Sequence, residues 1–114
     1  VYTFYGAMHT LCQKLINKYP KAVIFFITPL HRLNESMQLN ERGIRNVAPL
    51  AVYVDIIKEV ARYYSLPVLD LYAMSGMQPE VDIIRELYMP DGLHPSDAGA
   101  EIIAQRLVGF LRTL

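Results

Sequence analysis

The chain has 114 residues, against a prior of roughly 150 per domain, so it forms at most one domain. Hydrophobic residues make up 53% of it, a composition typical of packed globular proteins and not of disordered ones. Eleven Lys and Arg balance eleven Asp and Glu, which argues against nucleic acid or an anionic membrane surface as a partner. The longest stretch without these charges, residues 1–13, is too short for a membrane span of ~20 residues. The single cysteine, Cys12, rules out an internal disulfide and leaves the compartment open.

The first part of the chain predicts a helix, a strand and a long connection. Apolar residues at helical spacing predict a helix over residues 4–18, which Tyr19-Pro20 ends. An uninterrupted apolar run predicts a strand over residues 22–27 that is covered on both faces. Residues 30–47 lose this periodicity and are polar, which predicts a loop longer than most loops of compact domains.

The second part repeats the alternation of helix and strand. The pattern predicts a helix over residues 49–64, a short strand over 66–71, a short helix over 80–87 and a last helix over 96–111 with Ser96 or its neighbour as N-cap. Strands that alternate with helices imply a parallel α/β sheet with helices on both faces. Two parallel strands are marginal alone, so the chain is expected to be the back half of a larger α/β domain.

Residues 89–99, Met-Pro-Asp-Gly-Leu-His-Pro-Ser-Asp-Ala-Gly, carry the clearest chemical signal. The two prolines fix φ and Gly92 permits a tight turn, so this loop is expected to be stiff. A turn at Gly92 would let Asp91 accept a hydrogen bond from Nδ1 of His94, which aims Nε2 outward as a general base. On spacing alone, a helix cap beside an exposed histidine is the commoner interpretation of such a pair.

The whole Asp-Gly-Leu-His-Pro string, placed after a strand and before a C-terminal amphipathic helix, resembles the last catalytic block of the SGNH hydrolases, also called the GDSL esterase/lipase family. The order of the upstream segments is similar as well. This resemblance implies that Asp91 and His94 are two members of a Ser-His-Asp triad. It also implies a flavodoxin-like three-layer α/β/α fold with strand order 2-1-3-4-5, in which the two predicted strands are the fourth and fifth.

The chain departs from the family in one respect. The Gly-Asp-Ser block with the nucleophile and the Gly-x-Asn-Asp block of the oxyanion hole are absent from the 114 residues. We therefore expect residues 1–114 to be the C-terminal portion of a single SGNH hydrolase domain that is inactive in isolation. The strand over residues 22–27 would then lack its inner neighbour, which predicts self-association or pairing with the missing N-terminal half.

The resemblance implies an ester hydrolase that needs no metal or organic cofactor, with sugar acetyl esters and short-chain lipid esters both open as substrates. A non-enzymatic α/β interaction module, or an inactive fragment that pairs through its strand edge, is the alternative. His31 and Arg32 follow the first strand, at the end of the sheet where α/β folds bind ligands, and are candidate substrate contacts. Asp70 is expected to hold backbone donors of the next loop. A zinc site from His31, His94 and Asp97 lacks the usual ligand spacing.

Overall fold

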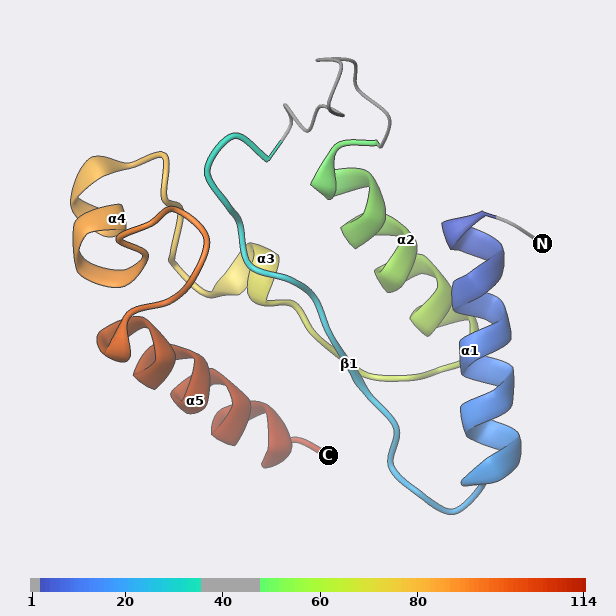
Figure 1. The fold of residues 1–114 in the computed structure, drawn as a ribbon. Coiled ribbons are helices and arrows are strands. Elements are labelled where there is room, and N and C mark those ends of the chain that lie inside the picture. The colour runs from blue at the N-terminus through green and yellow to red at the C-terminus, as the bar shows by residue number, and fades with distance from the viewer. Residues whose placement is uncertain (1–2, 36–47) are drawn as a thin grey trace.

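The computed structural model describes residues 3–35 and 48–114, and residues 36–47 of the predicted loop over residues 30–47 lie outside them. The described part contains helices and one parallel pair of strands (Figure 1). In chain order the elements are α1 (Phe4–Lys18), β1 (Phe26–Ile27), α2 (Leu50–Tyr63), β2 (Val68–Leu69), α3 (Leu71–Met74), α4 (Asp82–Tyr88) and α5 (Asp97–Leu111). No helix among them has the length and apolar character to cross a membrane.

The helix ends follow from local side-chain chemistry. The Thr3 side chain accepts a hydrogen bond from the backbone N–H of Gly6 at 3.0 Å and caps α1. Ser96 caps α5 in the same way, because its Oγ accepts from the N–H of Gly99 at 3.2 Å. The predicted bounds of the first and last helices are therefore confirmed. The short helix α3 was not predicted.

The sheet is parallel as predicted, but its strands are shorter. Phe26 pairs with Val68 and Ile27 with Leu69, so each strand has two residues in the ladder. The predicted strands over residues 22–27 and 66–71 were too long, because a residue joins a ladder only where a neighbouring strand runs beside it.

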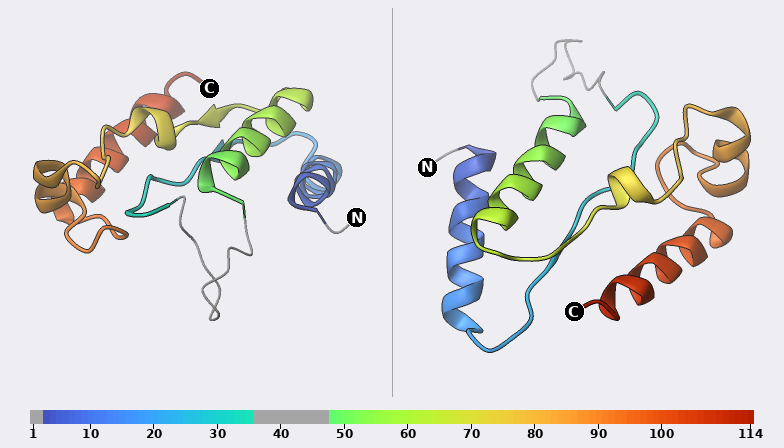
Figure 2. Two further views of the ribbon diagram at one scale, coloured as in Figure 1. Left: turned by 90° about the horizontal axis from the view of Figure 1, so that it is seen from above. Right: turned by 180° about the vertical axis from the view of Figure 1, so that it is seen from behind.

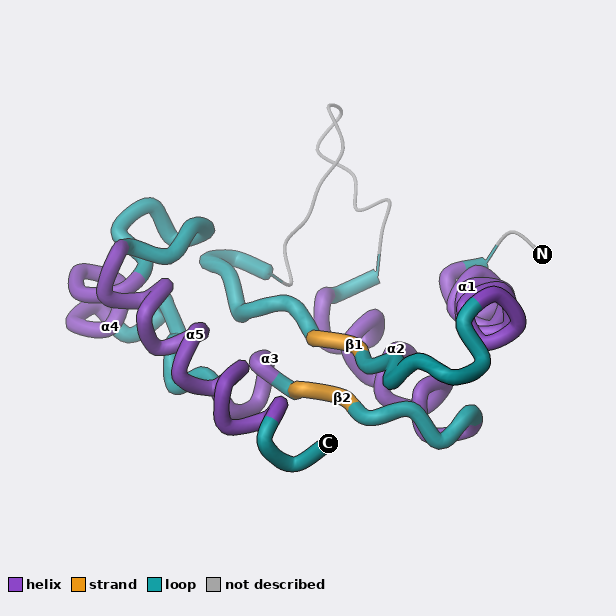
Figure 3. The backbone as a smooth tube through the Cα atoms, turned by 90° about the horizontal axis from the view of Figure 1, so that it is seen from below, coloured by secondary structure: helices purple, strands orange, loops and turns teal. Residues whose placement is uncertain are grey.

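Helices cover both faces of the strand pair. Phe26 packs against the buried cluster that α1 and α2 share, which consists of Met8, Cys12 and Val60. The preceding Phe25 lies with its ring centroid 5.3 Å from that of Phe110 on α5. Successive residues of an extended chain point to opposite faces, so α5 lies across the strands from α1 and α2. Figures 2 and 3 show the strands between these two groups of helices.

The edge of the sheet that β1 forms is open in the described residues. The N–H groups of Phe26 and Thr28 donate to Pro67 and Leu69, so the backbone of the intervening Ile27 points away from β2. No third strand pairs with that edge in the described part of the chain. Helices lie on both faces as expected, but the cover of the predicted strand is incomplete, because Val23 is 67% exposed and Ile27 is 44% exposed.

Candidate active site

The loop between α4 and α5 is held rigidly at both ends. Met89 is fully buried, and its carbonyl accepts a hydrogen bond from the N–H of Gly92 at 2.8 Å. The N–H of Ser96 donates to the carbonyl of Tyr88 at 2.7 Å, which closes the loop at its base. Gly92 has a φ of +76°, a conformation that other residues rarely adopt. The segment is therefore a fixed turn, in agreement with its proline and glycine content.

The turn brings Asp91 and His94 together. Oδ2 of Asp91 lies 2.6 Å from Nδ1 of His94, the hydrogen bond that the three-residue spacing predicted. Oδ1 of Asp91 accepts the backbone N–H groups of Leu93 at 2.8 Å and His94 at 2.7 Å. One carboxylate thus orders both the turn and the imidazole that the turn carries.

These bonds define the electrostatics of the pair. The bond from the His94 ring, followed by those from the backbone N–H groups of His94 and Leu93, holds the pKa of the Asp91 carboxyl well below its usual range. Because the ionised carboxylate accepts the Nδ1 proton, Nε2 of His94 is left for another partner. Both side chains are open to solvent, with exposed fractions of 55% for Asp91 and 74% for His94.

The loop after β1 contacts this turn directly. The backbone N–H of Leu33 donates to the carbonyl of Gly92 at 2.8 Å. The side chain of Leu33 lies against the same glycine, since a Cβ added to Gly92 would be 2.8 Å from Cβ of Leu33. Gly92 is therefore required both for its φ and for this close approach.

His31, a predicted substrate contact, lies in a network of side chains at the end of β1. Its Nδ1 is 2.8 Å from Oε2 of Glu35 and 3.3 Å from Nε2 of Gln78. Its ring stacks on that of Tyr72, with centroids 3.7 Å apart. Arg32, the second predicted contact, donates its backbone N–H to Glu35 at 3.2 Å. Glu35 and Tyr72 had not been singled out from the sequence, although the i, i+4 spacing of His31 and Glu35 was visible there.

Glu35 collects donors from two segments. Its carboxylate accepts hydrogen bonds from the His31 ring and the Arg32 N–H of the loop after β1, and from the hydroxyl of Tyr72 on α3. Burial raises the pKa of the Glu35 carboxyl, but the hydrogen bonds from Tyr72, His31 and Arg32 outweigh it and leave the pKa below its ordinary value. Burial and the bond to Glu35 raise the pKa of Tyr72 to about 12, so this hydroxyl remains a donor at neutral pH.

Asp70 has the structural surroundings expected of it. Its Oδ1 accepts the N–H of Ala73 at 3.2 Å and so caps α3, and it also accepts the buried hydroxyl of Thr28 at 2.9 Å. Its Oδ2 pairs with Nζ of Lys58 at 2.9 Å. Burial raises the pKa of Asp70, but the bonds from Lys58, Thr28 and Ala73 outweigh it and lower the pKa overall. This carboxylate thus joins both strand ends to α2.

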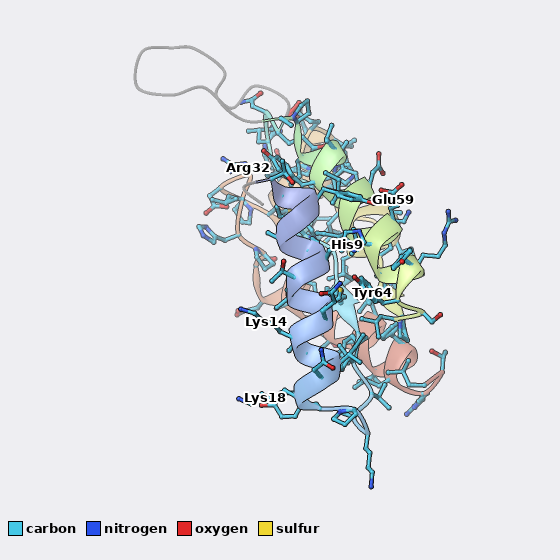
Figure 4. All side chains as sticks on the ribbon, turned by 90° about the vertical axis from the view of Figure 1, so that its right-hand side faces the viewer. His9, Lys14, Lys18, Arg32, Glu59 and Tyr64 are labelled. Carbon is cyan, nitrogen blue, oxygen red and sulfur yellow. The ribbon has the colours of Figure 1, made fainter. Side chains whose placement is uncertain are left out.

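The remaining histidine belongs to the packing of α1 on α2. Nδ1 of His9 lies 2.8 Å from the hydroxyl of Tyr64, which also accepts Nε2 of Gln13 at 2.9 Å. Figure 4 shows His9 and Tyr64 together between the two helices. These contacts give His9 a role in the packing of α1 against α2.

In the described residues, neither a cluster of metal-ligating side chains nor the groove beside α2 lies at the Asp91–His94 pair. No group of three His, Cys, Asp or Glu side chains with metal-binding geometry occurs in residues 3–35 and 48–114. An open groove of about 960 Å³ lies beside α2 and β2 and is lined in part by Asp55, Lys58 and Arg62. None of residues 89–96 lines that groove, so it is separate from the candidate site.

Solved structures with the same fold are about twice as long as the chain. A crystal structure with 40% identity has a TM-score of 0.80 and covers 97% of this chain, which spans 52% of that protein. A protein from Lactobacillus plantarum has 31% identity, a TM-score of 0.80 and coverages of 97% and 54%. A structure described as a possible lipase from Chitinophaga pinensis is 24% identical, with a TM-score of 0.69 and coverages of 97% and 60%.

No match is found among curated proteins. The sequence profile described as the GDSL-like Lipase/Acylhydrolase family, in contrast, matches residues 2–102 and so covers most of the chain. The match includes the two strands and the turn with Asp91 and His94. The chain belongs to the GDSL-like lipase/acylhydrolase family and has the parallel α/β architecture of SGNH hydrolases.

Proposed function

We propose that residues 1–114 provide the histidine and aspartate of a Ser-His-Asp ester hydrolase, and that the serine lies in a segment outside them. The observation that carries this proposal is the bond between Oδ2 of Asp91 and Nδ1 of His94, which leaves Nε2 as a base at the surface of a rigid turn. Membership of a hydrolase family supports the same reaction class. The chain itself would form the C-terminal portion of one SGNH domain.

The proposed reaction follows from the roles of these two groups. Nε2 of His94 removes the hydroxyl proton of the serine while its oxygen attacks the acyl carbon of an ester. The tetrahedral intermediate collapses with cleavage of the bond to the alcohol oxygen, and His94 returns the proton to that leaving group. A water molecule, deprotonated by the same nitrogen, then releases the acid and restores the serine. Asp91 stays ionised throughout and stabilises the imidazolium.

The open edge of β1 is proposed to pair with the segment that carries the serine. The backbone of Ile27 points to this edge and its side chain is 44% exposed, so on the side away from β2 the apolar strand β1 has no neighbour in the described residues. Solved relatives of the same fold have nearly twice the length of this chain, which supports a complementary half of comparable size. Self-association through the same edge would compete with that pairing.

His31 and Arg32 are proposed to border the substrate. They follow β1 at the carboxyl end of the sheet, and the adjoining Leu33 contacts the turn of Asp91 and His94. We propose a sugar acetyl ester or a short-chain lipid ester as the substrate, and a panel of p-nitrophenyl esters and acetylated sugars would separate the two.

Kinetics of ester hydrolysis test the proposal. The full-length protein that contains residues 1–114 should turn over p-nitrophenyl acetate, and His94→Ala should abolish turnover. The matched control is His9→Ala, because His9 lies between α1 and α2 and away from the turn. The isolated 114-residue chain should be inactive. Full activity in His94→Ala, or His94-dependent turnover by the isolated chain, would contradict the proposal.

A non-enzymatic interaction module is the second candidate, favoured by the open edge of β1. It predicts binding through that edge without any dependence on His94. Substitution of Ile27 by Lys would then abolish binding, whereas His94→Ala would leave it unchanged.

A further inference from the structure

We propose that Glu35 is a positioning residue for the reaction: it fixes the loop after β1, and through Leu33 it holds the turn with Asp91 and His94 in position. This inference rests on the proposed function. Glu35 itself lies on a different segment from the two triad members and makes no hydrogen bond to either of them in the described residues.

The first step is the anchoring of the loop by Glu35. Its carboxylate accepts the His31 ring at 2.8 Å and the backbone N–H of Arg32 at 3.2 Å, both within the loop. It also accepts the hydroxyl of Tyr72, which belongs to α3 and is fixed in turn because its own N–H donates to the buried Thr28. A single acceptor therefore ties the loop to the rigid end of the strand pair.

The second step is the transmission from the loop to the turn. Leu33 lies between the anchored residues and donates its N–H to the carbonyl of Gly92 at 2.8 Å. A Cβ added to Gly92 would lie only 2.8 Å from the Cβ of Leu33, so the two segments are in direct contact. Gly92 directly follows Asp91, and a shift of Leu33 therefore moves the carboxylate that orients His94.

The side chains of the Glu35 network are more restrained by their contacts than those of the Asp91–His94 pair. Both carboxylate oxygens of Glu35 have partners, and the side chain is 20% exposed. His31 is wedged between Glu35 and the Tyr72 ring, which removes its rotational freedom. By contrast, Asp91 and His94 are more than half exposed, so little besides the turn and its contact with Leu33 restrains them.

Kinetics and amide exchange in the full-length protein test the role of Glu35. Glu35→Ala should lower kcat for p-nitrophenyl acetate by ~10- to 100-fold, because misplacement of a catalytic group costs that much. The change in KM should be smaller than the change in kcat, although Glu35 also holds His31 and Arg32. Glu35→Gln, which keeps an oxygen for Tyr72, should recover part of kcat. The Leu33 amide should exchange faster in Glu35→Ala. The matched control is Glu86→Ala, an exposed carboxylate on α4 without a hydrogen bond or ion pair to the described residues.

Several results would overturn the inference. An unchanged kcat with a protected Leu33 amide would show that Glu35 does not hold the turn, and an effect confined to KM would place Glu35 in substrate binding. A loss of kcat that Glu86→Ala reproduces would reflect general destabilisation. If the wild-type protein has no His94-dependent activity, the proposed function fails. Leu33 exchange in Glu35→Ala then decides by itself whether the carboxylate positions the turn.

Discussion

The contact of Gly92 with Leu33 gives the sharpest prediction on stability. The Cβ that Gly92→Ala adds would lower the free energy of unfolding for two reasons. A left-handed conformation costs a residue with a Cβ about 1–2 kcal/mol, and the φ of Gly92 is +76°. The same Cβ would lie 2.8 Å from Cβ of Leu33, and overpacking of this kind costs about 1–3 kcal/mol. The sum is a loss of about 2–5 kcal/mol in the free energy of unfolding.

Gly76 provides the matched control. It has the same φ of +76°, but a Cβ added there has no heavy atom within 4 Å. Gly76→Ala should therefore lose only the conformational part, about 1–2 kcal/mol. Leu33→Ala in the Gly92→Ala background should relieve part of the additional cost, because it removes the atoms beyond Cβ that the new methyl group crowds.

Urea unfolding of the full-length protein and its variants, followed by circular dichroism, measures these differences. We expect Gly92→Ala to be the less stable of the two glycine variants and to lose ester hydrolysis, since the turn must shift to accommodate the methyl group. Equal unfolding free energies for Gly76→Ala and Gly92→Ala would refute the assignment of the Leu33 contact.

Three further predictions concern the polar groups. Asp91→Asn should lower kcat on the order of 10⁴-fold, the loss known for the same change in a serine protease triad, as measured by p-nitrophenyl acetate kinetics. The amide presents a donor to Nδ1 of His94, but its oxygen can still accept hydrogen bonds from the backbone N–H groups of the turn, so stability should change little. Thr28→Val should cost about 1–3 kcal/mol in urea unfolding, because it leaves the N–H of Tyr72 without its buried acceptor, and an unchanged midpoint would contradict this. The pKa of Asp70 is lower in the folded protein than its ordinary value of 3.8, so its stabilising contribution is present above about pH 4 and is lost as the pH falls further. Asp70→Asn should therefore flatten the pH dependence of the unfolding free energy in that range. An unaltered slope would argue against the hydrogen bonds from Lys58 and Thr28.

Features encoded by neighbouring residues could be predicted from the sequence. Ser96 and the apolar spacing after it are sufficient to place α5, and Tyr19-Pro20 ends α1 as expected. The bond between Asp91 and His94 is also local, because both residues belong to one turn. Membership of the family was inferred from that same string.

Features that depend on distant segments could not be predicted. Strand length was overestimated, because a run of apolar residues marks extended chain while the ladder depends on what lies beside it. The contact of Leu33 with Gly92 joins segments nearly sixty positions apart, and no periodicity signals it. Glu35 lies in a stretch without regular structure, so its link to Tyr72 became visible only in the fold.

Covalent labelling with a fluorophosphonate tests the central claim most directly. The probe reacts with a serine that a neighbouring histidine activates, and mass spectrometry after digestion locates the adduct. We predict one adduct in the full-length protein, on a serine outside residues 1–114, and its loss in His94→Ala but not in His9→Ala. An adduct that forms equally in His94→Ala, or one on a serine within residues 1–114, would contradict the assignment of His94 as the base of the triad.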